Sequence, residues 1–242
     1  MPTNLPATSD AALKQLRLLQ LADSALPVGA AAHSFGLETL VAEEALTVAQ
    51  LGTFLADYVA EVGVLEAGFC RAGYAVGAGL DGILDEAGWL ELNLRLSALK
   101  PARESRTASA MLGRRLLRLL LALETWPQAE QALHAAQQAG VEIHYSTAFG
   151  LAGGILELDE EATTLAYLQQ MVTGLVSACQ RLLPLGQSEA ARLIWQLKPA
   201  LLSAAQFSRG LDWEKTPFQC FIPVVEVASM RHPILHTRLF MS

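Results

Sequence analysis

Apolar positions along most of the chain recur with the period of an α-helix. Between residues 51 and 62 they fall at i, i+3, i+4, i+7, i+8 and i+11, and a helical pattern returns between residues 165 and 182. Thr47 and Gln50 have the spacing of a capping box, which predicts the start of the first of these helices. No stretch alternates with the period of two that is typical of half-buried strands. The pattern therefore predicts an all-α protein.

Proline and glycine divide this pattern into about ten predicted helices. Pro199 is expected to start or kink a helix, and the breaks are predicted at residues 27–29, 81–82, 100–101, 126–127, 140, 153–154, 184–186 and 210. Because long Gly/Ser linkers and internal repeats are missing, we expect a single helical-bundle-like domain over residues 11–210. A flexible tail is expected over residues 1–10.

The texture of the sequence changes over residues 211–242. Pro217, Pro223 and Pro233 interrupt this segment, although aromatic and apolar residues persist in it. Such a segment cannot bury itself as one helix. We expect an irregular C-terminal tail that either packs against the helical domain or becomes ordered on a partner.

The composition is more apolar than that of a typical globular domain. Of the 242 residues, 52% are hydrophobic and only 17% are charged. A sizeable core is expected, together with extra apolar surface buried against a second copy or a partner. No uncharged apolar run reaches the length of a membrane span, and the first residues do not resemble a secretory signal. The three widely spaced cysteines indicate neither a disulfide framework nor a zinc site, so a cytoplasmic protein is expected.

Charge is distributed unevenly along the chain. The net charge is −7, from 17 basic and 24 acidic residues, which disfavours general nucleic-acid binding. Residues 38–91 hold ten acids and one base, whereas residues 95–118 hold seven bases and one acid. These segments form either ordinary solvated helix faces or two electrostatic patches that orient partners or protomers.

Few residue patterns point to chemistry of the chain's own. Residues 32–36 nearly match the G-x-S-x-G motif of serine hydrolases, but that motif follows a strand, and Ser34 is better placed to cap a helix. His232 and His236 have an i, i+4 spacing that could hold a metal, although Pro233 lies between them. No nucleotide-binding motif occurs. A small hydrolase using His33 and Ser34 therefore remains a minor alternative, and a generic helical interaction domain is another.

Four segments together resemble the urease accessory protein family UreF. They are Leu26-Pro-Val-Gly29 with His33-Ser-Phe-Gly-Leu-Glu38, then Glu104-Ser-Arg-Thr-Ala-Ser109-x-x-x-Gly113-Arg114, Arg181-Leu-Leu-Pro-Leu-Gly-Gln187, and Arg231-His232 with Arg238-Leu-Phe-x-Ser242. Their order and spacing span nearly the whole chain. The resemblance implies an all-helical homodimer that makes no chemistry itself.

The resemblance also implies partners. UreF-like proteins bind the accessory protein UreD, also called UreH, and recruit the GTPase UreG, and the complex inserts nickel into apo-urease. No stably bound cofactor is therefore expected on this chain, since nickel and GTP are handled by the complex. No nucleic acid or membrane is expected as a partner. The residues expected to bind partners are Pro27, Gly29, His33, Ser34, Gly36, Glu38, Arg106, Gly186, Gln187, Arg231, His232, Arg238, Leu239, Phe240 and Ser242.

Overall fold

The computed structural model describes residues 7–79, 82–211 and 222–242, and within them every regular element is helical. No strand occurs in these ranges, which confirms the all-α prediction. The helices are α1 (Ala7–Leu21), α2 (Leu37–Ala42), α3 (Leu51–Tyr58), α4 (Val64–Gly77), α5 (Glu86–Ala98), α6 (Arg103–Leu123), α7 (Pro127–Ala139), α8 (Tyr145–Ile155), α9 (Glu160–Leu182), α10 (Gln187–Gln196), α11 (Lys198–Ser208) and α12 (Pro223–Arg231). Short 3₁₀ turns cover Ala30–Ala32, Val48–Gln50 and His232–Ile234.

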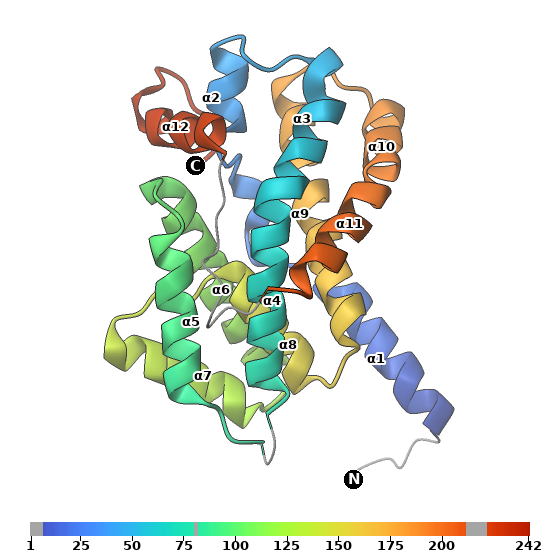
Figure 1. Ribbon diagram of the computed structural model, residues 1–242, viewed down its shortest axis with the longest axis vertical. Helices are drawn as coiled ribbons and strands as arrows, with labels where there is room; N and C mark the ends of the chain where they lie inside the picture. The colour runs from blue at the N-terminus through green and yellow to red at the C-terminus, as the bar shows by residue number, and fades with distance from the viewer. Residues whose placement is uncertain (1–6, 80–81, 212–221) are drawn as a thin grey trace.

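Helix α8 is the centre of the bundle, and all of its residues are buried. It packs behind α4 in Figure 1, with α6 and α9 also against it. The α4–α8 crossing is exceptionally close: a Cβ on Gly150 would lie 1.8 Å from the carbonyl oxygen of Cys70, and one on Gly73 would lie 2.2 Å from that of Thr147. Glycine at these positions lets two backbones touch, which fixes the spacing of the core.

Most predicted helix boundaries are confirmed. Helices α7 and α11 begin with Pro127 and Pro199 in their first turns, where the missing proline N–H costs nothing. Gly140 ends α7 with φ of +67°. The expected capping box is present, since Gln50 Oε1 accepts the Thr47 N–H at 3.0 Å. Of the predicted break at residues 81–82, Asp81 lies outside the described residues.

The predicted break at Gly153 and Gly154 is wrong. Both residues are inside α8, which continues to Ile155. A Cβ on Gly154 would lie 2.4 Å from the carbonyl oxygen of Tyr74, and one on Gly153 would lie 2.5 Å from the Thr163 side chain. These glycines therefore serve helix packing rather than chain reversal.

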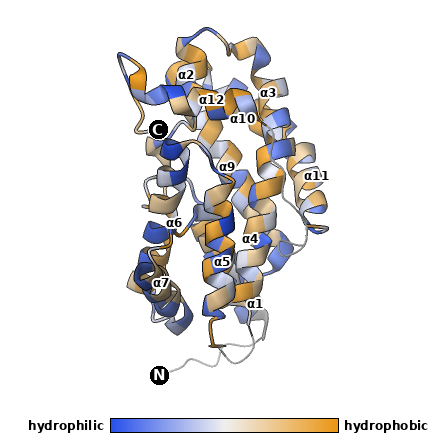
Figure 2. Cartoon of the chain, turned by 60° about the vertical axis from the view of Figure 1, so that its left-hand side comes forward, coloured by the Kyte–Doolittle hydropathy of each residue, from blue (hydrophilic) through white to orange (hydrophobic). Residues whose placement is uncertain are grey.

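Residues Val48–Gly77 form one long helical rod in which the π-helical segment Val59–Gly63 joins α3 to α4. By length and composition alone it is the one helix in the described ranges that could cross a membrane, with a mean hydropathy of 1.3. Its side chains Leu55 and Phe69 are fully buried against other helices of the bundle. Figure 2 shows apolar residues along α3 and α4. An apolar helix that packs in a bundle along one side passes the same test of length and composition as a membrane span.

Candidate partner-binding surface

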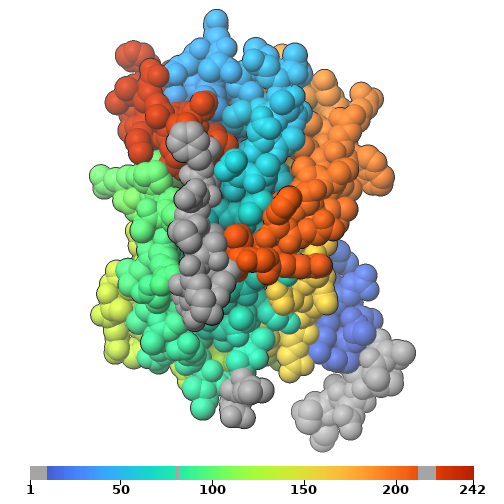
Figure 3. Space-filling model, viewed as in Figure 1, coloured from blue at the N-terminus to red at the C-terminus, as the bar shows by residue number. Residues whose placement is uncertain are grey.

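The C-terminal residues return to the turn that precedes α2, so two segments from opposite ends of the sequence lie side by side. Helix α12 packs against α2 (Figure 1), and the same region forms one continuous corner of the molecule in Figure 3. The Met241 N–H donates to the Ala32 carbonyl at 2.8 Å. The main-chain oxygen of Ser242 accepts the Ser34 N–H at 2.5 Å and the Ser34 hydroxyl at 2.9 Å. Two alternatives were expected for the C-terminal tail, and residues 222–242 adopt the first: they pack against the helical domain.

Glu38 is the main acceptor for this returning segment. Its buried carboxylate accepts hydrogen bonds from the Leu239 N–H at 2.6 Å and the Phe240 N–H at 3.1 Å. His232 Nε2 lies 2.9 Å from the same carboxylate. Burial raises the pKa of the Glu38 carboxyl, but the two main-chain donors and His232 outweigh burial and hold the pKa below 4.5. The charged carboxylate thus fixes the path of the backbone at residues 239–240.

His232 lies fully buried between two carboxylates. Its Nε2 faces Glu38 Oε2 at 2.9 Å, and its Nδ1 faces Glu104 Oε2 at 2.7 Å. Both contacts can be hydrogen bonds from the ring only when the imidazole is doubly protonated. Since both ring nitrogens are engaged, His232 could act as a metal ligand together with His236, four residues on, only by leaving these partners. Among the described residues no group of three or more His, Cys, Asp or Glu side chains is suited to a metal ion.

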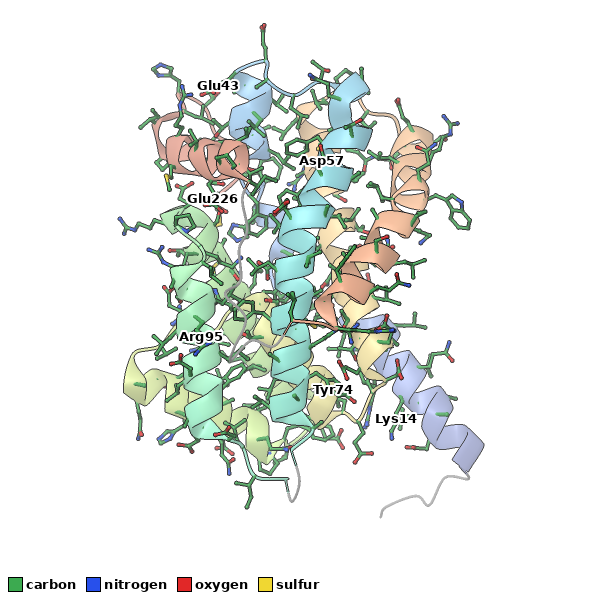
Figure 4. All side chains as sticks on the ribbon, viewed as in Figure 1. Lys14, Glu43, Asp57, Tyr74, Arg95 and Glu226 are labelled. Carbon is green, nitrogen blue, oxygen red and sulfur yellow. The ribbon has the colours of Figure 1, made fainter. Side chains whose placement is uncertain are left out.

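Two arginines hold the edges of the segment. The Arg181 guanidinium lies 4.1 Å from the centroid of the buried Phe240 ring, a cation–π contact, and it donates to the Ala31 carbonyl. Arg231 pairs with Glu43 at 2.9 Å. Figure 4 shows Glu43 directly after α2 and Glu226 on α12. The Glu226 carboxylate accepts the Ala102 N–H at 3.1 Å. The C-terminal segment is therefore fixed to α2, α6 and α9 together.

The turn before α2 depends on glycine, and Ser34 is not its N-cap as predicted. Helix α2 begins at Leu37 with Gly36 as the N-cap, at φ of +88°. A Cβ on Gly36 would lie 2.9 Å from the Val225 carbonyl oxygen, so only glycine permits both this φ and the approach of α12. The Ser34 hydroxyl lies 3.4 Å from the Glu38 N–H, a long contact, and bonds Ser242 instead. Gly29 has φ of +86° and lies against Arg115.

The geometry at residues 33 and 34 gives no support to a hydrolase. Ser34 follows the 3₁₀ turn Ala30–Ala32 rather than a strand, and its hydroxyl donates to a main-chain oxygen. His33 Nδ1 pairs with the Ser242 hydroxyl at 2.7 Å. Both side chains thus hold the C-terminal segment, and neither activates the other.

The remaining predicted residues do not join this cluster as closely. Pro27 is exposed; Arg106 donates to the Lys100 carbonyl at 2.8 Å and lies 3.8 Å from Glu142. Arg238 is 3.8 Å from Glu104, at the rim. Gly186 is the N-cap of α10, with φ of −70°, and Gln187 is the first residue of that helix. In Figure 1, α10 lies on the opposite side of the bundle from α12.

Sequence reasoning missed three residues that complete the cluster: Glu43, Glu104 and Arg181. The contact from His232 to Glu104 spans 128 positions and that from Arg181 to Ala31 spans 150. No local spacing marks such partners. Glu104 and Arg181 did stand inside the segments that carry the family resemblance, which was the one available signal.

The C-terminal segment, residues 222–242, exposes many apolar side chains. Fourteen large hydrophobic residues are exposed among those described, and six lie between residues 224 and 241, namely Val224, Val227, Met230, Ile234, Leu239 and Met241. Their backbone is anchored by the contacts above, so this surface is ordered although its side chains face solvent. Exposed apolar surface of this density is typical of a protein–protein interface.

Comparison with known proteins identifies the family. A family model named UreF matches residues 46–198. The chain belongs to the UreF family. It is 35% identical to "Urease accessory protein UreF" of Nostoc sp. over 94% of this chain and 95% of the relative, and 35% identical to the protein of that name from Paenarthrobacter aurescens over 94% and 98%. The UreF of Haemophilus influenzae is 30% identical over 93% and 94%. The chain is thus a member of a family of urease accessory proteins.

His33 is expected to make stability depend on pH. Burial, and secondly the charge of Arg115, lower the pKa of His33 from 6.5 to about 4. Between these values the unfolded chain binds a proton that the folded chain does not, so stability is full above pH 6.5 and falls as pH decreases. Relative to a His33→Asn variant, the wild type should lose about 2 kcal/mol more between pH 7 and pH 5. Urea unfolding at both pH values measures this difference. His134→Asn, at an exposed position, should leave the wild-type dependence unchanged.

Proposed function

We propose that this chain is a non-catalytic scaffold that acts with its accessory partners in nickel insertion into apo-urease. It bridges UreD or UreH to the GTPase UreG, as a homodimer in the cytoplasm, while nickel and GTP are handled by the complex. Membership of a family of urease accessory proteins supports the assignment to urease maturation. The more specific role rests on the surface formed by residues 224–241.

One observation carries the proposal: a rigidly anchored backbone presents exposed apolar side chains. The Leu239 N–H and the Phe240 N–H bond Glu38, and the Phe240 ring is buried, whereas the Leu239 side chain is 72% exposed. An interface with a preorganised backbone loses little conformational entropy on binding. The residues expected from the sequence to bind partners thus fall into two roles. Glu38, His232 and Phe240 hold the surface, and Leu239 faces outward.

Leu239→Asp should abolish partner binding without unfolding the chain. The side chain contributes little to the core, while a carboxylate in an apolar interface remains without a partner and should weaken the complex at least about a hundredfold. Leu16→Asp on α1 is the matched control, since Leu16 is also exposed, at 64%. Co-purification of each variant with UreD/UreH and UreG from the same source, with circular dichroism for the fold, makes the comparison. Equal recovery of partners with wild type and Leu239→Asp would exclude this surface as the docking site.

A further inference from the structure

The arginines of α6 are arranged in a way that packing within the chain does not explain. Arg103, Arg114 and Arg118 are exposed on this 21-residue helix. At about 100° per residue they fall within one sector of roughly 60°, which also holds Thr107. The helix thus carries a row of three cations along one side. Figure 2 shows polar turns along α6 on the outside of the bundle.

These cations have no acidic partner of their own. In the part of the chain that the structure describes, ion pairs occupy Arg17, Arg71, Arg95, Arg106, Arg209, Arg231 and Arg238. Arg115 bonds the Val28 carbonyl, and Arg181 bonds Ala31. Only four described arginines lack an ion pair or a side-chain hydrogen bond, and three of them are Arg103, Arg114 and Arg118; the fourth is Arg192. In a chain of net charge −7, leaving this row unneutralised is notable.

The row continues into an apolar groove. A groove of about 560 Å³ separates the N-terminal half of α6 from α12 and the C-terminal segment, and its lining includes Arg103, Met111, Met230 and Met241. Methionine side chains are flexible and polarisable, so they adapt to an apolar partner surface. The one acidic side chain in the lining of this groove, Glu104, is engaged by His232 and Arg238. A bound molecule would therefore meet free cations beside an adaptable apolar strip.

The described part of the chain does not offer an acidic complement to this row. The described acids without a hydrogen-bond or ion-pair partner are Glu44, Asp57, Glu86, Glu130 and Glu189, and each lies on or beside a different helix. Within residues 7–79, 82–211 and 222–242, no row of unpaired acids matches the arginine row, which argues against a second copy as its occupant. The apolar groove and the overall negative charge argue against nucleic acid, which calls for basic surface without apolar strips.

We propose that the arginine row of α6 and the adjoining methionine groove form a docking surface for a partner protein that presents a row of acidic side chains beside an apolar edge. This inference rests on the proposed function and specifies the chemistry of one accessory partner. The cations orient the partner and speed its association, and the groove supplies apolar area that is buried in the complex. The interface then extends beyond the C-terminal segment onto α6.

The test is charge reversal in the full-length chain. The triple variant R103E/R114E/R118E should bind UreD/UreH or UreG about a hundredfold more weakly than the wild type at about 0.05 M NaCl. At about 1 M NaCl, where the Debye length falls to roughly 3 Å, the two should differ by less than about threefold. R192E, which reverses the remaining unpaired arginine, is the matched control and should bind as the wild type does. Circular dichroism checks that each variant is folded.

A second variant identifies the groups that are contacted. R114K/R118K keeps both charges and supplies amines that a carbodiimide joins to carboxylates without a spacer. We expect cross-linked peptides between position 114 or 118 and an Asp or Glu of the partner. Unchanged affinity in the triple variant, together with no such cross-link, would overturn the inference while leaving the proposed function intact.

Other outcomes are also decisive. If the wild type binds neither partner, the proposed function fails and the inference fails with it. If the triple reversal instead converts a dimer to a monomer in light scattering, the row is an interface between copies. If the wild type binds a labelled DNA duplex and the triple variant does not, the row is a phosphate-binding surface. Either result overturns the assignment to an acidic protein partner.

Discussion

Replacing Gly150 with alanine is expected to lower the free energy of unfolding by about 4 kcal/mol, which approaches complete loss of the fold. The new Cβ would lie 1.8 Å from the Cys70 carbonyl oxygen and 2.8 Å from the Tyr74 nitrogen. Both are backbone atoms of α4, so no side chain can move aside. Helices α4 and α8 would have to separate, and the packing around the fully buried α8 would be lost with them.

Two other glycines give a graded control. A Cβ on Gly153 would meet the Thr163 side chain at 2.5 Å, and that side chain can adjust, so Gly153→Ala should cost less than Gly150→Ala. Gly174, inside α9, has nothing within 4 Å of a Cβ, so Gly174→Ala should stabilise the protein by up to about 1 kcal/mol through helix propensity. Urea unfolding followed by circular dichroism measures the order. Equal stabilities at positions 150 and 174 would contradict the close α4–α8 contact.

Glu38→Ala should have the second largest effect, a loss of about 3 kcal/mol together with release of the C-terminal segment. The substitution removes the acceptor of the Leu239 and Phe240 N–H groups and leaves His232 beside Glu104 alone. Hydrogen exchange at the amides of residues 239 and 240 reports release directly. Both should exchange at least about a hundredfold faster than in the wild type, because two anchored N–H groups lose their acceptor.

Glu38→Gln separates shape from charge in the same contact. The amide keeps one acceptor oxygen but presents an NH₂ group and no negative charge, so we expect an intermediate loss. Asp57→Ala, at an exposed carboxylate on α3, is the control and should change neither stability nor exchange. The pKa of Glu38 is held below 4.5, so its contribution is full above that value and is lost as pH falls further. Slow exchange at residues 239 and 240 in Glu38→Ala would show that other contacts hold the C-terminal segment in place without Glu38.

What the sequence could predict was local. The helical period, the Thr47–Gln50 capping box and the helix starts at Pro127 and Pro199 depend on neighbours within a few positions, and all are confirmed. The error at Gly153–Gly154 has a non-local cause, because only the approach of α4 and α9 distinguishes a packing glycine from a breaking one. Spacing along the sequence could not distinguish Ser34 from Gly36 as the N-cap of α2. The close approach of α12 to Gly36 decides between them.

The candidate surface was predictable in part, and for a physical reason. The segments containing Ser34, Glu38, His232 and Phe240 could be singled out through resemblance, but not their mutual contacts. Hydrogen bonds from residue 34 to residue 242 span 208 positions and depend on the whole bundle between them. Glu104 and Arg181 became visible as anchors only once α6 and α9 stood on either side of the segment. Whether this surface binds a partner remains a prediction for the experiments above.

The junction between residues 34 and 242 also has a consequence for the order of folding. Closing so long a loop costs entropy that only an already assembled bundle can offset, since α2, α6 and α9 must all be in place to receive the segment. The C-terminal segment therefore packs onto the bundle late in folding. A chain whose core is incomplete cannot present the exposed apolar surface of residues 224–241. A partner that recognises this surface would bind fully folded copies of the chain in preference to folding intermediates. Binding of such a partner would then depend on completed folding of this chain.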